Sequence, residues 1–109
     1  MSPRIIPWFL VLAAATAQAD EPVGYQDGLR LMQKYHCQQC HAVDKSLSGP
    51  SLRAIAKRYV SDPNARDEVA ANILNGSIGA WGPLPMSPVQ VSQEDLRRLV
   101  DWILSLTPS

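Results

Sequence analysis

The stretch Cys37-Gln38-Gln39-Cys40-His41 decides how this chain must fold. Two cysteines separated by two residues, with a histidine directly after the second, form the attachment sequence of a c-type haem. The thiols add across the vinyl groups of the porphyrin, and the tethered histidine reaches the iron through a ring nitrogen. We therefore predict one covalent haem c, attached through Cys37 and Cys40 and ligated by His41.

Three other uses of the cysteine pair fit the sequence less well. A dithiol redox motif normally follows a β-strand, and the chain has no alternating or continuously apolar strand run. A structural zinc ion needs four ligands, and the one further Cys or His is His36, next to Cys37. A disulfide between the two cysteines stays open for an oxidising compartment, although it leaves His41 without a role.

Length and composition indicate one small exported domain. The chain has 109 residues, 46% of them hydrophobic, and a formal net charge of zero, which argues against a nucleic-acid or membrane-surface protein. Arg4 precedes an apolar run over residues 5–15 and a small-residue cleavage pattern at 17–19. We interpret residues 1–19 as a cleaved signal peptide and residues 20–109 as a single periplasmic domain. An uncleaved anchor is the alternative, but the run is shorter than the roughly 18–20 residues of a membrane span.

Apolar residues at helical spacing predict an all-α domain with four or five short helices and no sheet. The first helix covers residues 25–36 and runs into the haem motif. Gly28 in its middle indicates a tight crossing with another helix. The second covers 52–59, the third follows cap and proline signals at 62–64 and stops at Asn75-Gly76, and the fourth covers 92–104 and is ended by Pro108.

The segment 77–91 is predicted to be an irregular but stiff loop, because its prolines fix φ and remove amide donors. Met86 lies in this loop, far from His41 in sequence, where it can reach the opposite face of the haem. Met32 falls on the inward side of the first helix and fits core packing, while His36 adjoins the haem motif and is expected to point to solvent. We therefore predict Met86 as the second iron ligand. An apolar anchor for the loop is the plainer alternative.

Four further segments extend the pattern beyond the haem motif, and together they resemble class I bacterial monohaem cytochromes c. The resemblance is strongest to the small periplasmic cytochrome c551/c552 group. It implies the cytochrome c fold, with four to five short helices around one covalently bound haem. The segments lie between about Leu31 and Leu104 and are Gly49-Pro50, Asn75-Gly76-Ser77, Trp81-Gly82-Pro83-Leu84-Pro85-Met86 and Leu99-Val100-Asp101-Trp102-Ile103-Leu104.

The resemblance also implies roles for three residues outside the haem motif. The backbone carbonyl of Pro50 would accept a hydrogen bond from His41 and orient its ring, where the alternative is a simple Gly-Pro turn. The indole N–H of Trp81 would donate to a haem propionate, and loop packing is the alternative. Trp102 would lie where the last helix crosses the first, near Gly28.

Ligation by protein on both sides of the iron favours electron transfer over catalysis, because no site stays open for oxygen or peroxide. The expected function is a shuttle that carries single electrons between respiratory partners and is not an enzyme. One rival is a haem enzyme or gas sensor in which Met86 dissociates. Another is an interaction module without haem.

The expected partners are a donor and an acceptor redox protein, such as a cytochrome complex, a terminal oxidase or a nitrite reductase. We expect a monomer with no nucleic-acid partner and no membrane span in its mature form. Four basic residues could steer acidic partners to the haem edge, although a basic stripe is more often a solvated helix face. These residues are Lys45, Arg53, Lys57 and Arg58.

Overall fold

Four α-helices and one turn of 3-10 helix form the regular structure of this protein in a computed structural model, which describes residues 3 and 21–107. No strand occurs among those residues, which contain two isolated β-bridges, so the all-α prediction is confirmed. The predicted signal peptide lies outside the described residues except for residue 3, and Pro108 lies outside them too. The elements are α1 (Tyr25–Lys34), η1 (Cys37–Gln39), α2 (Leu52–Arg58), α3 (Ala65–Asn75) and α4 (Gln93–Leu104).

Side-chain caps and a glycine set several helix ends; the cap at Ser92 and the stop at Gly76 are as predicted, whereas Asn64, which precedes α3, makes no side-chain cap bond. The Ser51 hydroxyl accepts the amide hydrogen of Ala54 at 3.0 Å, and the Ser92 hydroxyl accepts that of Asp95 at 3.1 Å. Each serine therefore satisfies one of the amides that the first turn of its helix leaves unpaired. Gly76 follows α3 with φ +78°, a conformation that favours glycine.

The first helix ends earlier than predicted, at Lys34, and does not run into the haem motif. The amide of Tyr35 bonds to the Leu31 carbonyl at 3.1 Å, and His36 then takes a left-handed conformation with φ +61° and ψ +27°. A left-handed residue cannot continue a right-handed helix. The chain therefore turns at His36, and the separate turn η1 carries the first cysteine.

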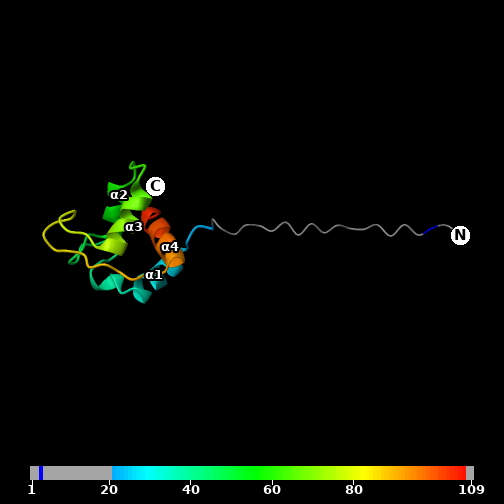
Figure 1. The fold of residues 1–109 in the computed structure, drawn as a ribbon, viewed down its shortest axis with the longest axis horizontal. Coiled ribbons are helices and arrows are strands. Elements are labelled where there is room, and N and C mark those ends of the chain that lie inside the picture. Colours follow the sequence, from blue (N-terminus) through cyan, green and yellow to red (C-terminus); the bar gives the residue numbers. More distant parts are fainter. Residues whose placement is uncertain (1–2, 4–20, 108–109) are drawn as a thin grey trace.

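Helix α4 is the centre of the fold, because it packs against α1, α2 and α3 (Figure 1). Its inner face is apolar at helical spacing, and Trp102, with 1% of its surface exposed, is the most deeply buried large side chain. None of the helices in the described part of the chain has the length and apolarity needed to cross a bilayer. The buried apolar residues of α4 are Leu99, Val100, Trp102 and Ile103.

Helices α1 and α4 touch at Gly28, where the sequence predicts a close crossing. A Cβ atom added to Gly28 would lie 2.0 Å from Cε2 of Trp102, so only glycine lets the indole ring lie on the α1 backbone. Tyr25 adds an edge-to-face contact with the same indole, at 6.1 Å between ring centroids. The crossing of Trp102 over Gly28 is therefore confirmed.

Replacing Gly28 with alanine tests this crossing. We expect Gly28→Ala to lower the free energy of unfolding by about 1–3 kcal/mol, because overpacking outweighs the better helix propensity of alanine. The measurement is denaturant unfolding of the purified protein. Gly24→Ala is the matched control, since its Cβ would meet nothing closer than Asp27 at 4.0 Å. Equal stability of the two variants would contradict a tight crossing.

A polar contact joins the end of α1 to the start of α4. The Asp95 carboxylate accepts hydrogen bonds from Lys34 Nζ at 2.8 Å and from the Tyr35 hydroxyl at 2.5 Å. The bond from Lys34, followed by that from Tyr35, lowers the pKa of the Asp95 carboxyl below its ordinary value. The charged form of Asp95 is therefore favoured in the folded protein.

This lowered pKa predicts a pH dependence of stability. A carboxyl whose pKa is lower in the folded than in the unfolded chain stabilises the fold above its unfolded pKa of about 3.9, and this contribution is lost as pH falls through the folded value. We expect the free energy of unfolding of the wild type to decrease more steeply below about pH 4 than that of Asp95→Asn. Parallel pH profiles of denaturant unfolding would contradict the contact.

Candidate functional site

His41 lies just after η1, with 8% of its surface exposed, and its ring is held by the backbone. Its Nδ1 is 2.7 Å from the carbonyl oxygen of Pro50, the contact that the sequence resemblance implies. A carbonyl oxygen accepts hydrogen bonds but donates none, so Nδ1 must carry the hydrogen. The lone pair of the ring then resides on Nε2, which is the nitrogen available to a metal.

Gly49 allows the Gly-Pro turn to fold closely over this ring. A Cβ atom there would lie 2.6 Å from Cε1 and 2.9 Å from Nδ1 of His41. The Gly49 amide also donates to the Cys40 carbonyl at 2.8 Å, which ties the turn to the second cysteine. Gly49-Pro50 is thus a fitted cover for His41 and not a generic turn. In the sequence Gly49 is visible only as part of a Gly-Pro motif, which does not indicate this role.

Cys37 and Cys40 form no disulfide in the structure, so the disulfide alternative is not observed. Cys40 is exposed, whereas Cys37 is partly buried, and this burial raises the pKa of its thiol. No group of three or more His, Cys, Asp or Glu residues suited to a metal occurs in the part of the chain that the structure describes. Cys37, Cys40 and His41 offer three ligands, one fewer than a structural zinc ion needs, and they stand in the attachment sequence of a c-type haem.

Met86 closes a loop, residues 77–86, which we call the Met86 loop. Its amide donates to the Ser77 carbonyl at 2.8 Å and its carbonyl accepts from the Ser77 amide at 3.0 Å. Just beyond it, the Val89 amide bonds to the Ile73 carbonyl at 2.9 Å and fastens the chain to the end of α3. Met86 is half-buried and packs against the hydrophobic core. Its backbone is therefore held on both sides.

Gly76 is what allows Met86 to come so close to α3. Its φ of +78° disfavours other residues, and a Cβ atom would lie 2.6 Å from the Met86 carbonyl oxygen. That Cβ would also meet Cδ of Pro88 at 3.1 Å. The sequence identified Gly76 as a helix stop, and the structure adds that it is a contact surface for the candidate ligand.

Trp81, the expected propionate donor, lies in the Met86 loop with 41% of its surface exposed. The guanidinium carbon of Arg58 is 4.5 Å from the centre of its ring, and Arg58 Nη1 donates to the Ala80 carbonyl at 2.6 Å. In the sequence Arg58 looks like a surface charge for docking. Its contact with this loop is not apparent there. It lies 22 positions before Ala80, and no local pattern signals the pairing.

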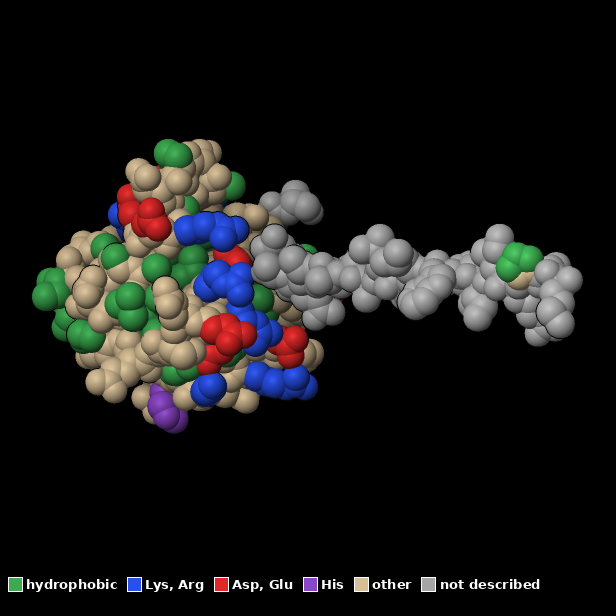
Figure 2. Space-filling view, turned by 45° about the vertical axis from the view of Figure 1, so that its right-hand side comes forward, with side chains coloured by type: hydrophobic (Ala, Val, Ile, Leu, Met, Phe, Trp, Pro, Cys, Tyr) green, Lys and Arg blue, Asp and Glu red, His purple; other side chains and the backbone are tan. Residues whose placement is uncertain are grey.

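The other basic residues considered for docking differ in what they contact. Arg53 is engaged within the fold, with Nε 2.6 Å from Asp44 and Nη1 2.7 Å from the Leu106 carbonyl. Lys45 and Lys57 are exposed. On the face in Figure 2, Lys and Arg side chains lie among Asp and Glu side chains and not in a patch of one sign. This face therefore gives little long-range steering by itself.

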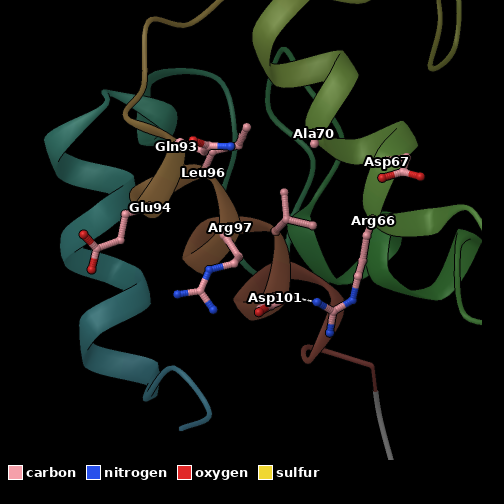
Figure 3. Close-up of a pocket in the computed structure, with 9 residues that line it drawn as sticks. Arg66, Asp67, Ala70, Gln93, Glu94, Leu96, Arg97 and Asp101 are labelled. Atoms are coloured by element: carbon pink, nitrogen blue, oxygen red, sulfur yellow. Dashed lines mark ion pairs between the residues drawn. The ribbon is translucent and has the colours of Figure 1, made fainter. Parts of the chain in front are cut away.

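Hollows open on the surface, and one of them adjoins His41. It has a volume of about 250 Å³ and is lined in part by Leu29, Met32 and Val43, which offer apolar contacts to a macrocycle. A larger one, about 490 Å³, lies between α3 and α4 and includes neither His41 nor Met86 (Figure 3). Charged side chains surround it, and Arg66 approaches Asp101 to 2.6 Å there without the alignment of a hydrogen bond. The hollow beside His41 is thus the one of the two that contains a residue of the sequence-predicted site.

Comparison with known proteins identifies the family. Residues 25–107 match the family model for cytochrome c, which is most of the chain. This chain belongs to the cytochrome c family. It is a class I monohaem cytochrome c of the c551/c552 group with one covalently attached haem c, as the sequence resemblance implied, and it is thus a haem-based electron-transfer protein.

Individual relatives agree with this assignment. The cytochrome is 41% identical over 96 residues to cytochrome c-551 of Stutzerimonas stutzeri, covering 88% of this chain and 92% of that protein. It is 40% identical over 97 residues to cytochrome c-552 of Nitrosomonas europaea, covering 88% and 86% of the two chains. The crystal structure of wild-type Nitrosomonas europaea cytochrome c552 superposes with a TM-score of 0.69 at 41% identity, over 72% of this chain and 99% of that one. The predicted cytochrome c fold is confirmed.

The contact of Gly76 with Met86 can be tested with a pair of glycines in this cytochrome. Gly76 and Gly79 have φ of +78° and +83°, but a Cβ at Gly79 would meet nothing within 4 Å. We expect Gly79→Ala to cost about 1 kcal/mol of unfolding free energy, from the backbone alone, and Gly76→Ala about 3 kcal/mol or more, because the Met86 carbonyl must also move. Denaturant unfolding measures both. Equal losses would show that the close approach is unimportant.

Proposed function

We propose that this cytochrome carries single electrons in the periplasm through an iron ligated by His41 Nε2 and by the sulfur of Met86. The observation that carries the proposal is that each candidate ligand is held by a separate backbone contact. His41 donates to the Pro50 carbonyl at 2.7 Å, and Met86 is paired with Ser77 through hydrogen bonds of 2.8 and 3.0 Å. Ligands held in this way can keep their places while the charge on the iron changes.

Haem c supplies one-electron chemistry when it is bound, and the residues of this chain hold and tune it. Cys37 and Cys40 would hold the haem through thioether bonds, and His41 would ligate its iron. Because the Pro50 carbonyl accepts the Nδ1 hydrogen, it makes the imidazole a stronger donor at Nε2. A methionine sulfur on the other side favours ferrous iron and raises the reduction potential.

Electron transfer, and not enzymatic catalysis, follows from protein ligation on both sides of the iron. Substrate chemistry at haem iron requires an open coordination position. Two features restrain Met86 from leaving: the pairing with Ser77 and the bond from Val89 to Ile73 that follows it. The rival function, a haem enzyme or gas sensor, requires these restraints to yield easily.

We also propose a cellular location, a pair of redox partners and a contact with a haem propionate. The apolar run and cleavage pattern within residues 1–19 support export to the periplasm, with residues 20–109 as the mature domain. As a monomer, the mature cytochrome would exchange electrons with a donor and an acceptor redox protein, such as a cytochrome complex, a terminal oxidase or a nitrite reductase. Trp81 would donate its indole N–H to a haem propionate.

Replacing Met86 with leucine tests the ligand set. We expect Met86→Leu to abolish the near-infrared sulfur-to-iron charge-transfer band of the oxidised form and to lower the reduction potential, because the thioether is lost. Met32→Leu is the matched control: this methionine is 3% exposed in the core, and we expect its variant to keep both properties. Absorption spectra and redox titration measure them. Survival of the band in Met86→Leu would refute the ligand assignment.

Binding of carbon monoxide to the wild type and to Met86→Leu distinguishes an electron shuttle from a haem enzyme or gas sensor. At neutral pH the reduced wild type is expected to show no spectral change with carbon monoxide, whereas reduced Met86→Leu should bind it. Rapid and complete conversion of the wild type would favour the haem enzyme or gas sensor.

A further inference from the structure

We propose that Arg58 is a positioning residue that fastens the Met86 loop to the end of α2 and so sets how readily Met86 leaves the iron. This inference rests on the proposed ligation by Met86. Arg58 touches neither His41 nor Met86 in the described contacts. It acts through the Met86 loop.

Arg58 contacts two consecutive residues of the Met86 loop in two different ways. Its Nη1 donates a charge-assisted hydrogen bond to the Ala80 carbonyl at 2.6 Å. The carbon of the same guanidinium lies 4.5 Å from the ring centre of Trp81, within the range of a cation–π contact. A planar guanidinium can bond through its edge and stack through its face at once, which a lysine ammonium cannot. One side chain thus fixes both the backbone and the ring of the loop.

The backbone of Arg58 is firmly positioned by the fold. Arg58 is the last residue of α2, and its neighbour Tyr59 is only 9% exposed and belongs to the hydrophobic core. The Arg58 guanidinium carbon also lies 6.0 Å from the centre of the Tyr59 ring. Helix α2 packs on α4, the central helix. The loop is therefore joined to the rigid part of the molecule.

Among the contacts within the described protein, few others hold the outer part of the loop, and the proposed bond from Trp81 to a haem propionate would add to them. Ile78 and Leu84 are 84% and 65% exposed. Gly79 and Gly82 have φ of +83° and +119°, and a Cβ added to either would meet no atom within 4 Å. The pairing of Ser77 with Met86 closes only the base of the loop. Arg58 therefore supplies a substantial part of the restraint on the tip.

The path from the tip to Met86 is short and contains two prolines. Pro83 and Pro85 follow Gly82 on the way to Met86, and each fixes its own φ, which limits how far the segment after Gly82 can bend. Release of the sulfur by a shift of the Met86 backbone would move the loop as well. The contacts of Arg58 with Ala80 and Trp81 then have to break or distort. Loss of Arg58 should make this displacement easier.

The first test is displacement of Met86 by added imidazole in the oxidised, haem-loaded protein. We expect Arg58→Ala to raise the affinity for imidazole about tenfold, the size expected when a charge-assisted hydrogen bond and a cation–π contact are lost near the surface. Lys57→Ala is the matched control, because it removes the same charge from the same helical turn at an exposed position. Its affinity should stay within about twofold of the wild type.

The second test is hydrogen exchange of backbone amides, which reports loop opening without added ligand. In Arg58→Ala the amides of Ser77 and Met86 should exchange about tenfold faster, whereas the Val89 amide, bonded to Ile73, should exchange as in the wild type. Equal acceleration of all three amides would mean that Arg58 merely supports the whole fold, and it would overturn the proposal. Arg58→Gln gives the same comparison, with a several-fold effect, if the alanine variant does not accumulate.

The outcomes distinguish this inference from the function on which it rests. Absence of the sulfur-to-iron band in the wild type would refute ligation by Met86 and, with it, both proposals. Presence of that band, together with an imidazole affinity of Arg58→Ala within twofold of the wild type, would overturn the role of Arg58 alone. Equal increases in Arg58→Ala and Lys57→Ala would also overturn it, because charge and not the tether would then be responsible.

Discussion

The hydrogen bond from His41 Nδ1 to the Pro50 carbonyl is the constraint on which the rest of the site depends. It decides which ring nitrogen keeps its lone pair, and it does so with a backbone atom that side-chain variation does not remove. Gly49 lets that backbone approach the ring, and the bond from Gly49 to the Cys40 carbonyl ties the turn to the attachment sequence. Imidazole, turn and cysteine thus form one local unit.

The two candidate ligands are held by different kinds of structure. His41 is positioned by residues within about ten positions of it, so its geometry is largely local. Met86 instead depends on Gly76, on the end of α3 and on the packing of α3 against α4. Loosening the helix packing should therefore disturb the position of Met86 before that of His41. With the proposed ligation by both residues, the reduction potential would be sensitive to the stability of the core.

Two arginines at the surface of this cytochrome connect separate segments of the fold. Arg58 links α2 to the Met86 loop, and Arg53 links the same helix to Asp44 and to the Leu106 carbonyl near the C-terminal end. In the sequence both look like members of a basic stripe on a helix. Their partners lie 22 and up to 53 positions away and include backbone carbonyls, which no side-chain pattern can reveal. A basic stripe is thus weak evidence for a docking face.

The sequence by itself determined the covalent haem, the helix pattern, the Gly28 crossing and Met86 as a candidate ligand, because attachment chemistry and helical periodicity are written in short, contiguous stretches. Tertiary structure alone decided that the first helix stops before His36, that Gly49 and Gly76 are fitted against the candidate ligands, and where Arg58 bonds. These features depend on how closely separate segments approach one another. Such distances arise only when packing around α4 brings those segments together.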